Sequence, residues 1–479
     1  MSIVLLSGAI CVSGHAQEVK PGESGDVNRW SKEKANAWYA EQPWLVGCNF
    51  IPSTAINQLE MWQADTFDAA TIDRELKWAA GLGFNTVRVY LHDLAYEADA
   101  DGFKKRIDQF LGLAAKYNIT PMLVLFDDCW NANPKVGKQP EPQPGVHNSG
   151  WLQSPGRDVV NNPALWPRLE KYLKDVVGTF AKDKRVLLWD LYNEPGNEGQ
   201  GNKSLPLLKK AFQWARESNP TQPLTAGVWT GFKDFNDFQE AASDVITFHN
   251  YNDAGSLAGQ IAGLKKHGRP VICTEWMRRG NSDVAACLPV FLKAKVGCIN
   301  WGLVAGKTQT IYPWGSPKGA PEPKVWFHDL LRKDGTPFNA EEAAIFSNFV
   351  AKSRAVVRVI VPTSEGEGSN WRYTVEQPAA DWQMPGFKDA AWKEGPGGFG
   401  TKDTPGGVIR TEWNTKDIWL RREFDWKADK AAKPVLSFRH DEDLEVYING
   451  VQVCKAGGFI GEYEETALPP EGIAALKPG

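Results

Sequence analysis

The feature that most constrains the fold is an alternation of short apolar runs with longer segments of helical periodicity. Short apolar runs separated by helical patterns are typical of parallel strands that are buried on both faces of a sheet. Eight such units are the number that closes a (β/α)₈ barrel, also called a TIM barrel, so we expect an α/β fold of that kind. The eight runs are residues 44–52, 84–93, 119–128, 186–195, 222–230, 244–252, 270–277 and 297–304.

The segments between the runs also fit a barrel. Residues 71–83, 101–118 and 163–183 each carry an apolar stripe at helical spacing, which predicts amphipathic helices outside the sheet. The segment AEEAAIFSNFVAKSR at 340–354 is the expected last helix. We therefore predict a catalytic barrel over residues 30–354. Residues 355–369, which contain most of the tract PTSEGEGSN, have the composition of a linker.

After the linker the sequence pattern changes to short stretches of alternating apolar residues with many turn residues. One of them, DLEVYINGVQV at 443–453, has an Asn-Gly pair between two apolar runs, which predicts a β-hairpin. Residues 370–479 are therefore predicted to form a smaller all-β sandwich, a jelly roll. The chain stops where further strands are expected, so this domain is expected to be incomplete at its C-terminus.

The N-terminal residues 1–16 resemble the remnant of a secretory signal, with an apolar run from Ile3 to Val12 and small residues before Gln17. This favours a secreted or periplasmic protein. No later segment is long and apolar enough to cross a bilayer. Of the seven cysteines, Cys48, Cys273 and Cys298 lie inside apolar runs, so we expect free buried thiols. A net charge of -4 gives no basic footprint for nucleic acid.

Polar residues collect at the ends of the otherwise apolar runs. Active residues of a (β/α)₈ barrel lie at the C-terminal ends of the strands, so these positions predict the site. They are Arg88, Asp127, Asp128, Asn193, Glu194, Trp229, His249, Tyr251, Glu275 and Trp301. Glycoside hydrolysis needs two carboxyl groups beside the scissile bond, and Glu194 and Glu275 end the fourth and seventh runs.

The neighbours of the two glutamates suit this chemistry. Arg88 and Tyr251 can hydrogen-bond Glu275, and Arg88 would favour its ionised form. Asn193 can reach the 2-OH of a sugar, and His249 can adjust Glu194. Trp301 would form an apolar floor under the sugar ring.

These residues carry a resemblance to a known family. The sequences LYNEP at 191–195 and TEW at 274–276, in order with Arg88, His249-x-Tyr251 and Trp301, resemble clan A glycoside hydrolases, closest to the cellulase-like family 5. The resemblance implies a retaining β-glycosidase with Glu194 as acid/base, Glu275 as nucleophile, and no metal or other cofactor. It also implies a β-linked polysaccharide or derived oligosaccharide as substrate. Residues 370–479 are similar to the sugar-binding jelly roll of family 2 β-glycosidases, through IWLRREF, HDEDLEVYINGV and WKEGPGGFGT.

Other positions are open to two interpretations. The family usually has a His at the end of the third strand, where this chain has Asp127-Asp128-Cys129-Trp130, so one of the two aspartates is expected to line the pocket. Trp229 is as consistent with a core residue as with a sugar subsite. The long polar and aromatic loops at 145–151 and 306–314 are expected to shape the cleft; their candidate sugar contacts are His147, Asn148 and Lys307.

Two alternatives to hydrolysis stay open at this point. A transglycosylase would use the same two glutamates and differ only in the acceptor of the glycosyl group. A carbohydrate-binding protein that has lost turnover would keep the barrel, although binding alone needs no acid and nucleophile.

Overall fold

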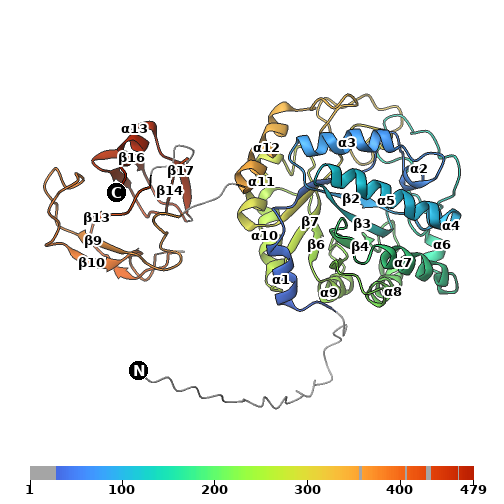
Figure 1. Ribbon diagram of the computed structural model, residues 1–479, viewed down its shortest axis with the longest axis horizontal. Helices are drawn as coiled ribbons and strands as arrows, with labels where there is room; N and C mark the ends of the chain where they lie inside the picture. The colour runs from blue at the N-terminus through green and yellow to red at the C-terminus, as the bar shows by residue number, and fades with distance from the viewer. Residues whose placement is uncertain (1–28, 355–358, 405–406, 428–432, 462) are drawn as a thin grey trace, which may run out of the picture. The chain divides into compact units, whose positions relative to one another are not determined.

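The computed structural model describes residues 29–354, 359–404, 407–427, 433–461 and 463–479. The chain divides into two compact units, residues 1–355 and 356–479, and each is described by itself (Figure 1). The predicted leader at residues 1–16 lies outside the described residues, and so do residues 355–358 at the start of the predicted linker.

The first unit contains a parallel sheet of eight strands in the order β5-β4-β3-β2-β1-β8-β7-β6. Each strand lies within one of the eight apolar runs, so the predicted barrel strands are confirmed. They are β1 (Val46–Asn49), β2 (Thr86–Tyr90), β3 (Thr120–Asp127), β4 (Leu188–Asn193), β5 (Leu224–Thr225), β6 (Ile246–His249), β7 (Val271–Trp276) and β8 (Gly297–Trp301).

The sheet closes between β5 and β6. Val228, three residues beyond β5, forms a parallel bridge with Phe248 of β6. The backbone N–H of Val228 donates to Thr247 (2.9 Å), and the N–H of His249 donates to Val228 (2.9 Å). The closing contact therefore includes the residue that ends β6, His249.

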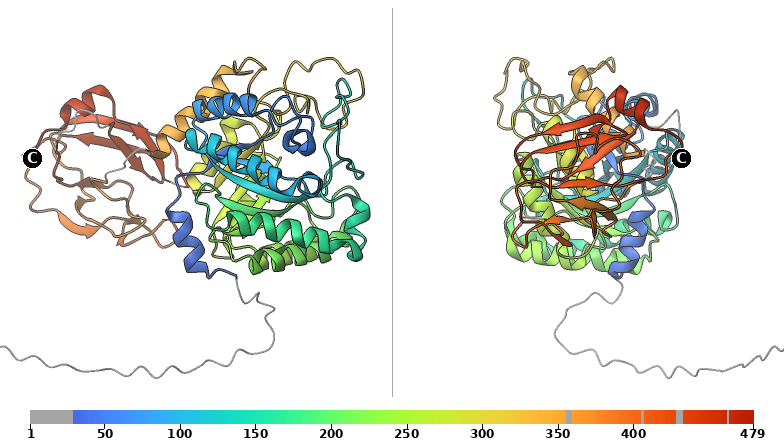
Figure 2. Two further views of the ribbon diagram at one scale, coloured as in Figure 1. Left: turned by 45° about the vertical axis from the view of Figure 1, so that its right-hand side comes forward. Right: turned by 90° about the vertical axis from the view of Figure 1, so that its left-hand side faces the viewer.

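Helices surround this sheet, as Figure 2 shows from two sides. The four predicted helices appear as α3, α5, α7 and α12. In α5 the side chains at 103, 107, 110, 111 and 114 are buried, which is the stripe expected of a helix packed against a sheet. The helices are α1 (Lys32–Ala40), α2 (Gln58–Trp62), α3 (Ala69–Gly81), α4 (Asp93–Ala98), α5 (Ala100–Lys116), α6 (Arg157–Val160), α7 (Trp166–Phe180), α8 (Leu205–Glu217), α9 (Lys233–Ala242), α10 (Ala254–Lys265), α11 (Val284–Ala294) and α12 (Ala340–Arg354), with 3₁₀ turns η1 (Pro163–Leu165) and η2 (Gly201–Ser204).

The barrel interior changes character along the strands. At the N-terminal end an apolar cluster fills it, made by Leu45, Met122, Leu187, Leu188, Val245, Ile272 and Ile299. Further along the strands, Asn49, Arg88 and Asp190 are buried polar residues. A packed apolar layer below a polar layer is the arrangement that keeps water out of the base of the site.

The second unit is built mainly from short strands. Asn449 and Gly450 both have positive φ (49° and 85°) between β15 and β16, so the predicted Asn-Gly hairpin is confirmed. Three of the small sheets are antiparallel, whereas β11 and β12 pair in parallel; a jelly roll stays a prediction. The elements are β9 (Asn370–Thr374), β10 (Lys393–Pro396), β11 (Phe399–Gly400), β12 (Thr411–Glu412), β13 (Trp419–Arg421), β14 (Val435–Phe438), β15 (Leu444–Ile448), β16 (Val451–Ala456), β17 (Glu464–Ala467) and the helix α13 (Pro470–Ala475).

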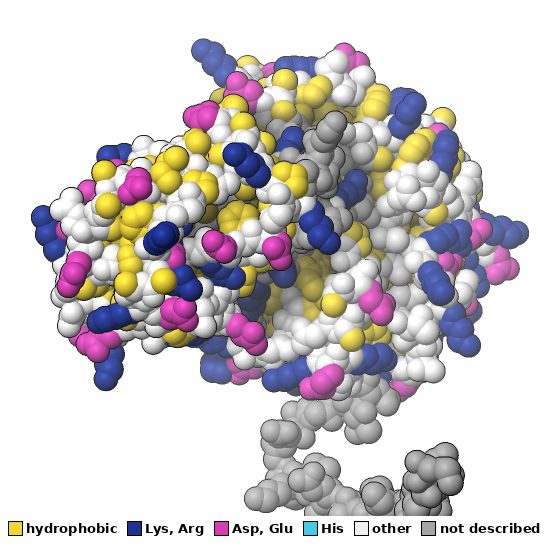
Figure 3. Space-filling view, turned by 60° about the vertical axis from the view of Figure 1, so that its left-hand side comes forward, with side chains coloured by type: hydrophobic (Ala, Val, Ile, Leu, Met, Phe, Trp, Pro, Cys, Tyr) yellow, Lys and Arg dark blue, Asp and Glu magenta, His cyan; other side chains and the backbone are white. Residues whose placement is uncertain are grey.

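The structure also bears on the expectations for the cysteines, for membrane-spanning helices and for surface charge. The six cysteines among the described residues are free, and five of them are buried, as predicted. No helix in the described part of the chain is long and apolar enough to cross a membrane. Basic and acidic side chains are interspersed over the face shown in Figure 3, in keeping with the small net charge.

Candidate active site

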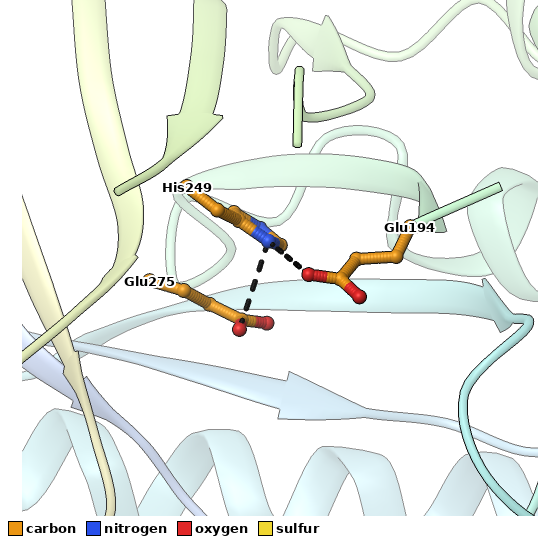
Figure 4. A group of neighbouring side chains, drawn as sticks. All are labelled: Glu194, His249 and Glu275. Atoms are coloured by element: carbon orange, nitrogen blue, oxygen red, sulfur yellow. Dashed lines mark hydrogen bonds and ion pairs between the residues drawn. The ribbon is translucent and has the colours of Figure 1, made fainter. Parts of the chain in front are cut away.

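Glu194, His249 and Glu275 meet at the C-terminal ends of the barrel strands (Figure 4). Glu194 directly follows β4, with a positive φ of 43°, and Glu275 lies in β7 beside His249 of β6. His249 Nδ1 lies 2.8 Å from Oε1 of Glu194 and 3.6 Å from Oε2 of Glu275. One oxygen of each carboxylate and a ring nitrogen of His249 lie within 4.8 Å of one another.

Glu275 is held by three donors. Arg88 Nη1 (2.8 Å) and the hydroxyl of Tyr90 (2.9 Å) donate to Oε1, and the hydroxyl of Tyr251 (2.8 Å) donates to Oε2. The Glu275 side chain is 6% exposed. A buried carboxylate with one cationic and two hydroxyl donors is fixed in orientation.

Arg88 is fully buried and joins several strands around Glu275. Its Nη2 lies 2.8 Å from Oδ2 of Asp190 on β4 and donates to Oδ1 of Asn193 (2.8 Å). Its Nη1 also donates to Asn49 of β1 (3.0 Å). An arginine keeps its charge in proteins, so the guanidinium is a permanent cation beneath the two glutamates.

Glu194 has a different environment. His249 contacts one of its oxygens; Asn197 Nδ2 (2.6 Å) and the thiol of Cys129 (3.3 Å) donate to the other. Burial pushes the pKa of Glu194 upward, but the contact with His249 and the Cys129 and Asn197 donors outweigh it and leave the pKa below its usual range. The 2.8 Å contact joins Oε1 of Glu194 to Nδ1 of the His249 imidazole.

Asp127 and Asp128 lie behind the site. Asp127 accepts hydrogen bonds from Asn193 Nδ2 (2.9 Å) and Trp151 Nε1 (2.8 Å), and Asp128 accepts from the hydroxyl of Tyr192 (2.7 Å) and the N–H of Gly196 (2.7 Å). Burial raises the pKa of Asp127 to about 7 and that of Asp128 to about 6. Neither aspartate is part of the cavity lining, contrary to the expectation that one of them would line the pocket. Asp127 instead orients Asn193, and Asp128 fixes the turn that follows Glu194.

The two glutamates open into a cavity of about 640 Å³, part of which is open solvent. Its floor includes Trp301, whose ring meets Trp151 edge-on at 5.6 Å and Tyr90 at 5.9 Å. The cavity is lined by Cys129, Trp130, His147, Asn148, Trp151, Asn193, Glu194, Asn197, Glu198, Tyr251, Glu275, Trp301, Trp314 and His328.

Two expected sugar contacts lie outside this lining. Lys307 forms an ion pair with Glu60 (2.6 Å), because its loop folds back toward the segment that follows β1. Trp229 donates from Nε1 to the carbonyl of Pro195 (3.1 Å) and so braces the turn beyond Glu194.

Sequence reasoning missed several residues of the site. Tyr90 lies two residues after Arg88 on β2, and residues two apart on a strand share a face, so its position carried a usable signal. Cys129, Asn197 and His328 lie in loops, where no periodicity tells which way a side chain points.

The group Glu194, His249 and Glu275 has the atom types and spacing that could hold a metal ion. The donors already described occupy both oxygens of each carboxylate, and the Arg88 cation adjoins Glu275. This donor set suits proton transfer and nucleophilic attack better than metal ligation, so the expectation of a metal-free site stays a prediction.

Comparisons with solved structures returned matches at low sequence identity. GH5_18 from Streptomyces cattleya, in complex with GlcNAc, is 14% identical over 66% of this chain and 82% of its own, with a TM-score of 0.46. The exo-β-1,4-mannosidase Op5Man5 from Opitutaceae bacterium strain TAV5 is 17% identical, over 64% and 59% of the two chains (TM-score 0.46). GH5_18 from Bifidobacterium longum subsp. longum ATCC 55813 is 11% identical, over 67% and 81% (TM-score 0.45).

The search of curated proteins found no match. The sequence model of the family described as Cellulase (glycosyl hydrolase family 5) matches residues 48–306, which is more than half of the chain and includes every barrel strand except the first two residues of β1. The chain therefore belongs to glycosyl hydrolase family 5, and it is a glycosidase that hydrolyses O-glycosyl bonds of a carbohydrate.

Proposed function

We propose that this protein is a retaining β-glycoside hydrolase that works by double displacement, with Glu275 as nucleophile and Glu194 as acid/base. The observation that carries the proposal is the closeness of the two carboxylates, which have oxygens within 4.8 Å of each other. Retaining enzymes hold their carboxyl groups about 5–5.5 Å apart, whereas inverting enzymes need about 6.5–9.5 Å to admit a water molecule. The substrate class is a β-linked polysaccharide or an oligosaccharide derived from one.

The division of labour follows from the surroundings of each glutamate. Glu275 accepts hydrogen bonds from Arg88, Tyr90 and Tyr251, so its carboxylate is held in one orientation from which it can attack the anomeric carbon. Glu194 has no arginine donor among the described residues and contacts the imidazole of His249 (2.8 Å), a neighbour with which it can exchange a proton, so its carboxyl is placed to give a proton and take one back.

In the first step Glu275 forms a bond to the anomeric carbon while the glycosidic C–O bond breaks. Glu194 gives its proton to the leaving oxygen, and a glycosyl-enzyme ester remains. In the second step Glu194 takes a proton from water, whose oxygen attacks the anomeric carbon and releases Glu275. Two inversions at one carbon give net retention.

The amide of Asn193 completes the arrangement. Its oxygen accepts from Arg88 and its nitrogen donates to Asp127, so the side chain cannot rotate freely beside Glu194. An amide locked in this way is pre-organised for a hydroxyl of the bound sugar ring, a contact that strengthens in the transition state.

The test combines stereochemistry with two variants. NMR of the first-formed product of a 4-nitrophenyl β-glycoside is expected to show the β-anomer before mutarotation. Glu275→Ala should lower kcat at least about 10³-fold. Glu194→Ala should lower it about 10²- to 10⁴-fold on a substrate with a poor leaving group.

Azide separates the two roles. With Glu194→Ala it should restore turnover and give a β-glycosyl azide, whereas with Glu275→Ala it should give the α-glycosyl azide. Glu217→Ala is the matched control, since Glu217 is an exposed glutamate at the end of α8 that is not part of the cavity lining. An α-anomer as the first product, or full activity in either catalytic variant, would contradict the mechanism.

A further inference from the structure

We propose that the site accepts a single uncharged sugar at the non-reducing end of its substrate, so that the enzyme acts as an exo-glycosidase. This inference rests on the proposed function, because it uses the roles of Glu194 and Glu275 to orient the substrate. Two observations support it. The loops after β3 and β8 and the aromatic and histidine rings on them form a wall on one side of the cavity, and the described residues that line the cavity include acidic side chains but no Lys or Arg.

The wall begins with two loops that are hydrogen-bonded together, one after β3 and one after β8. The N–H of Asn148 donates to the carbonyl of Thr308 (2.8 Å), and Nδ1 of His147 lies 2.7 Å from the carbonyl of Tyr312. Further along, the N–H of Gly145 donates to the side chain of Gln309 (2.9 Å). In the sheet, β2 and β1 lie between β3 and β8, so the joined loops close the barrel mouth above these two strands.

A series of rings forms the inner face of this wall. Trp130 stacks on His147 at 5.5 Å, and His147 contacts His328 at 5.4 Å. Trp314 lies 5.7 Å from His328 and meets Tyr251 edge-on at 5.0 Å. The series therefore runs from the β3 loop, across the β8 loop, to the end of β6.

The wall lies on the side of the nucleophile. Tyr251, its last ring, donates directly to Glu275. The nucleophile bonds to the anomeric carbon, so the sugar whose carbon is attacked lies toward Glu275 and the wall. The leaving group lies toward Glu194, where the lining continues with Asn197 and the exposed Glu198. The wall thus limits the chain on the side of the attacked sugar and leaves the leaving-group side open.

The lining also selects against charge. Among the described residues, those that line the cavity include no Lys or Arg, while they include Glu194, Glu198 and Glu275. A sugar carboxylate would therefore meet several acidic groups and no free cation, which disfavours a uronic acid.

The two histidines of the wall act as neutral hydrogen-bond partners. Burial lowers the pKa of His147 to about 4 and lowers that of His328 as well, so both rings are uncharged near pH 7. Each ring donates from Nδ1 to a backbone carbonyl, of Tyr312 and Met277 respectively, which leaves Nε2 as an acceptor. Nε2 of His328 is buried without a protein partner, and a sugar hydroxyl is the donor that it suits.

The first experiment compares defined substrates with the wild-type enzyme. The panel contains 4-nitrophenyl β-glycosides of glucose, mannose, galactose, xylose and N-acetylglucosamine, the β-glucuronide, and end-labelled β-1,4-oligosaccharides of the sugar that is hydrolysed. We expect at least one neutral monosaccharide glycoside to be cleaved, and the glucuronide to be cleaved at least about 100-fold more slowly. The oligosaccharides should lose one residue at a time from the non-reducing end.

The second experiment removes part of the wall. Trp314→Ala should increase cleavage at internal bonds of the labelled oligosaccharide at least tenfold relative to terminal cleavage, whereas Trp314→Phe, which keeps a ring, should not. Trp314 is 41% exposed, so neither change is expected to unfold the barrel.

The inference and the proposed function fail in different ways. Early internal cleavage by the wild type, preferred hydrolysis of the glucuronide, or silence on every neutral monosaccharide glycoside would overturn the inference. If Glu275→Ala abolishes that activity and the β-anomer forms first, the proposed function stands even so. Unimpaired turnover by Glu275→Ala would contradict both the proposed function and the inference that rests on it.

Discussion

Arg88→Met tests whether one buried cation holds the site and the barrel together. The guanidinium contacts five side chains, and the change leaves Asp190 and Glu275 without it; their side chains are 0% and 6% exposed. Removing one partner of a buried ion pair costs about 3–5 kcal/mol. At about 2 °C per kcal/mol for a large domain, the Tm should fall by roughly 6–10 °C. Because Glu275 also loses its cationic donor, kcat/KM should fall by about 10- to 100-fold.

The assay pairs thermal unfolding, followed by near-UV circular dichroism, with hydrolysis kinetics measured at least 15 °C below the variant's Tm. The matched control is the double variant Arg88→Met/Asp190→Leu. In it an apolar side chain also replaces Asp190, one of the two carboxylates that lose Arg88. It should recover a large part of the Tm, since apolar replacement of a buried pair is often neutral. It should not recover activity, because Glu275 still lacks Arg88.

Two results would refute this reasoning. A Tm for Arg88→Met within about 1 °C of the wild type would mean that the buried carboxylates are not left unpaired. Recovery of activity together with stability in the double variant would mean that Arg88 serves the fold and not the orientation of Glu275.

Three further predictions concern single side chains. Tyr251→Phe removes one donor to Glu275, and we expect kcat/KM to fall by roughly 10- to 100-fold with little change in Tm, measured by steady-state kinetics and thermal unfolding. Burial raises the pKa of Glu75 to about 7, so the folded state binds this proton more tightly than the unfolded state, and stability falls as pH rises from about 4.5 to 7. Glu75→Gln should remove up to about 3 kcal/mol of this decline in the free energy of unfolding, measured by urea unfolding at a series of pH values. The same dependence of that free energy on pH in the variant and the wild type would contradict the prediction. Lys307→Ala should alter kcat/KM less than about twofold and the free energy of unfolding by less than about 1 kcal/mol, because Lys307 pairs with Glu60 at a half-exposed position. A larger loss of activity would indicate that Lys307 contacts the sugar after all.

The barrel could be predicted because its strands are buried on both faces. Each therefore appears in the sequence as an apolar run, and helical stripes lie between the runs. The residues at the ends of these runs could be grouped for the same reason, since parallel strands end at one mouth. Arg88, Glu194, His249, Tyr251 and Glu275 do meet there.

The same reasoning could not predict the contacts between loops or the direction in which a strand-end side chain points. Asp127 ends a strand and Asp128 follows it, and only tertiary contacts with Asn193, Trp151 and the turn after Glu194 decide that both point away from the cavity. The contact of His147 with the β8 loop joins segments more than 160 residues apart in the sequence. No local pattern encodes such a pairing, so the wall was expected only as two long loops beside the cleft.

The closure of the barrel between β5 and β6 has a consequence for breathing motions of the enzyme. β5 is two residues long, and the contact that completes the ring depends on Val228, whose carbonyl accepts the N–H of His249. Local opening needs least free energy where the fewest backbone bonds must break, so this seam should exchange its amide hydrogens earlier than the long β3–β4 interface. Each such opening would carry His249 away from Glu194. The rate of hydrogen exchange at one seam would therefore also report how often Glu194 is free of this partner.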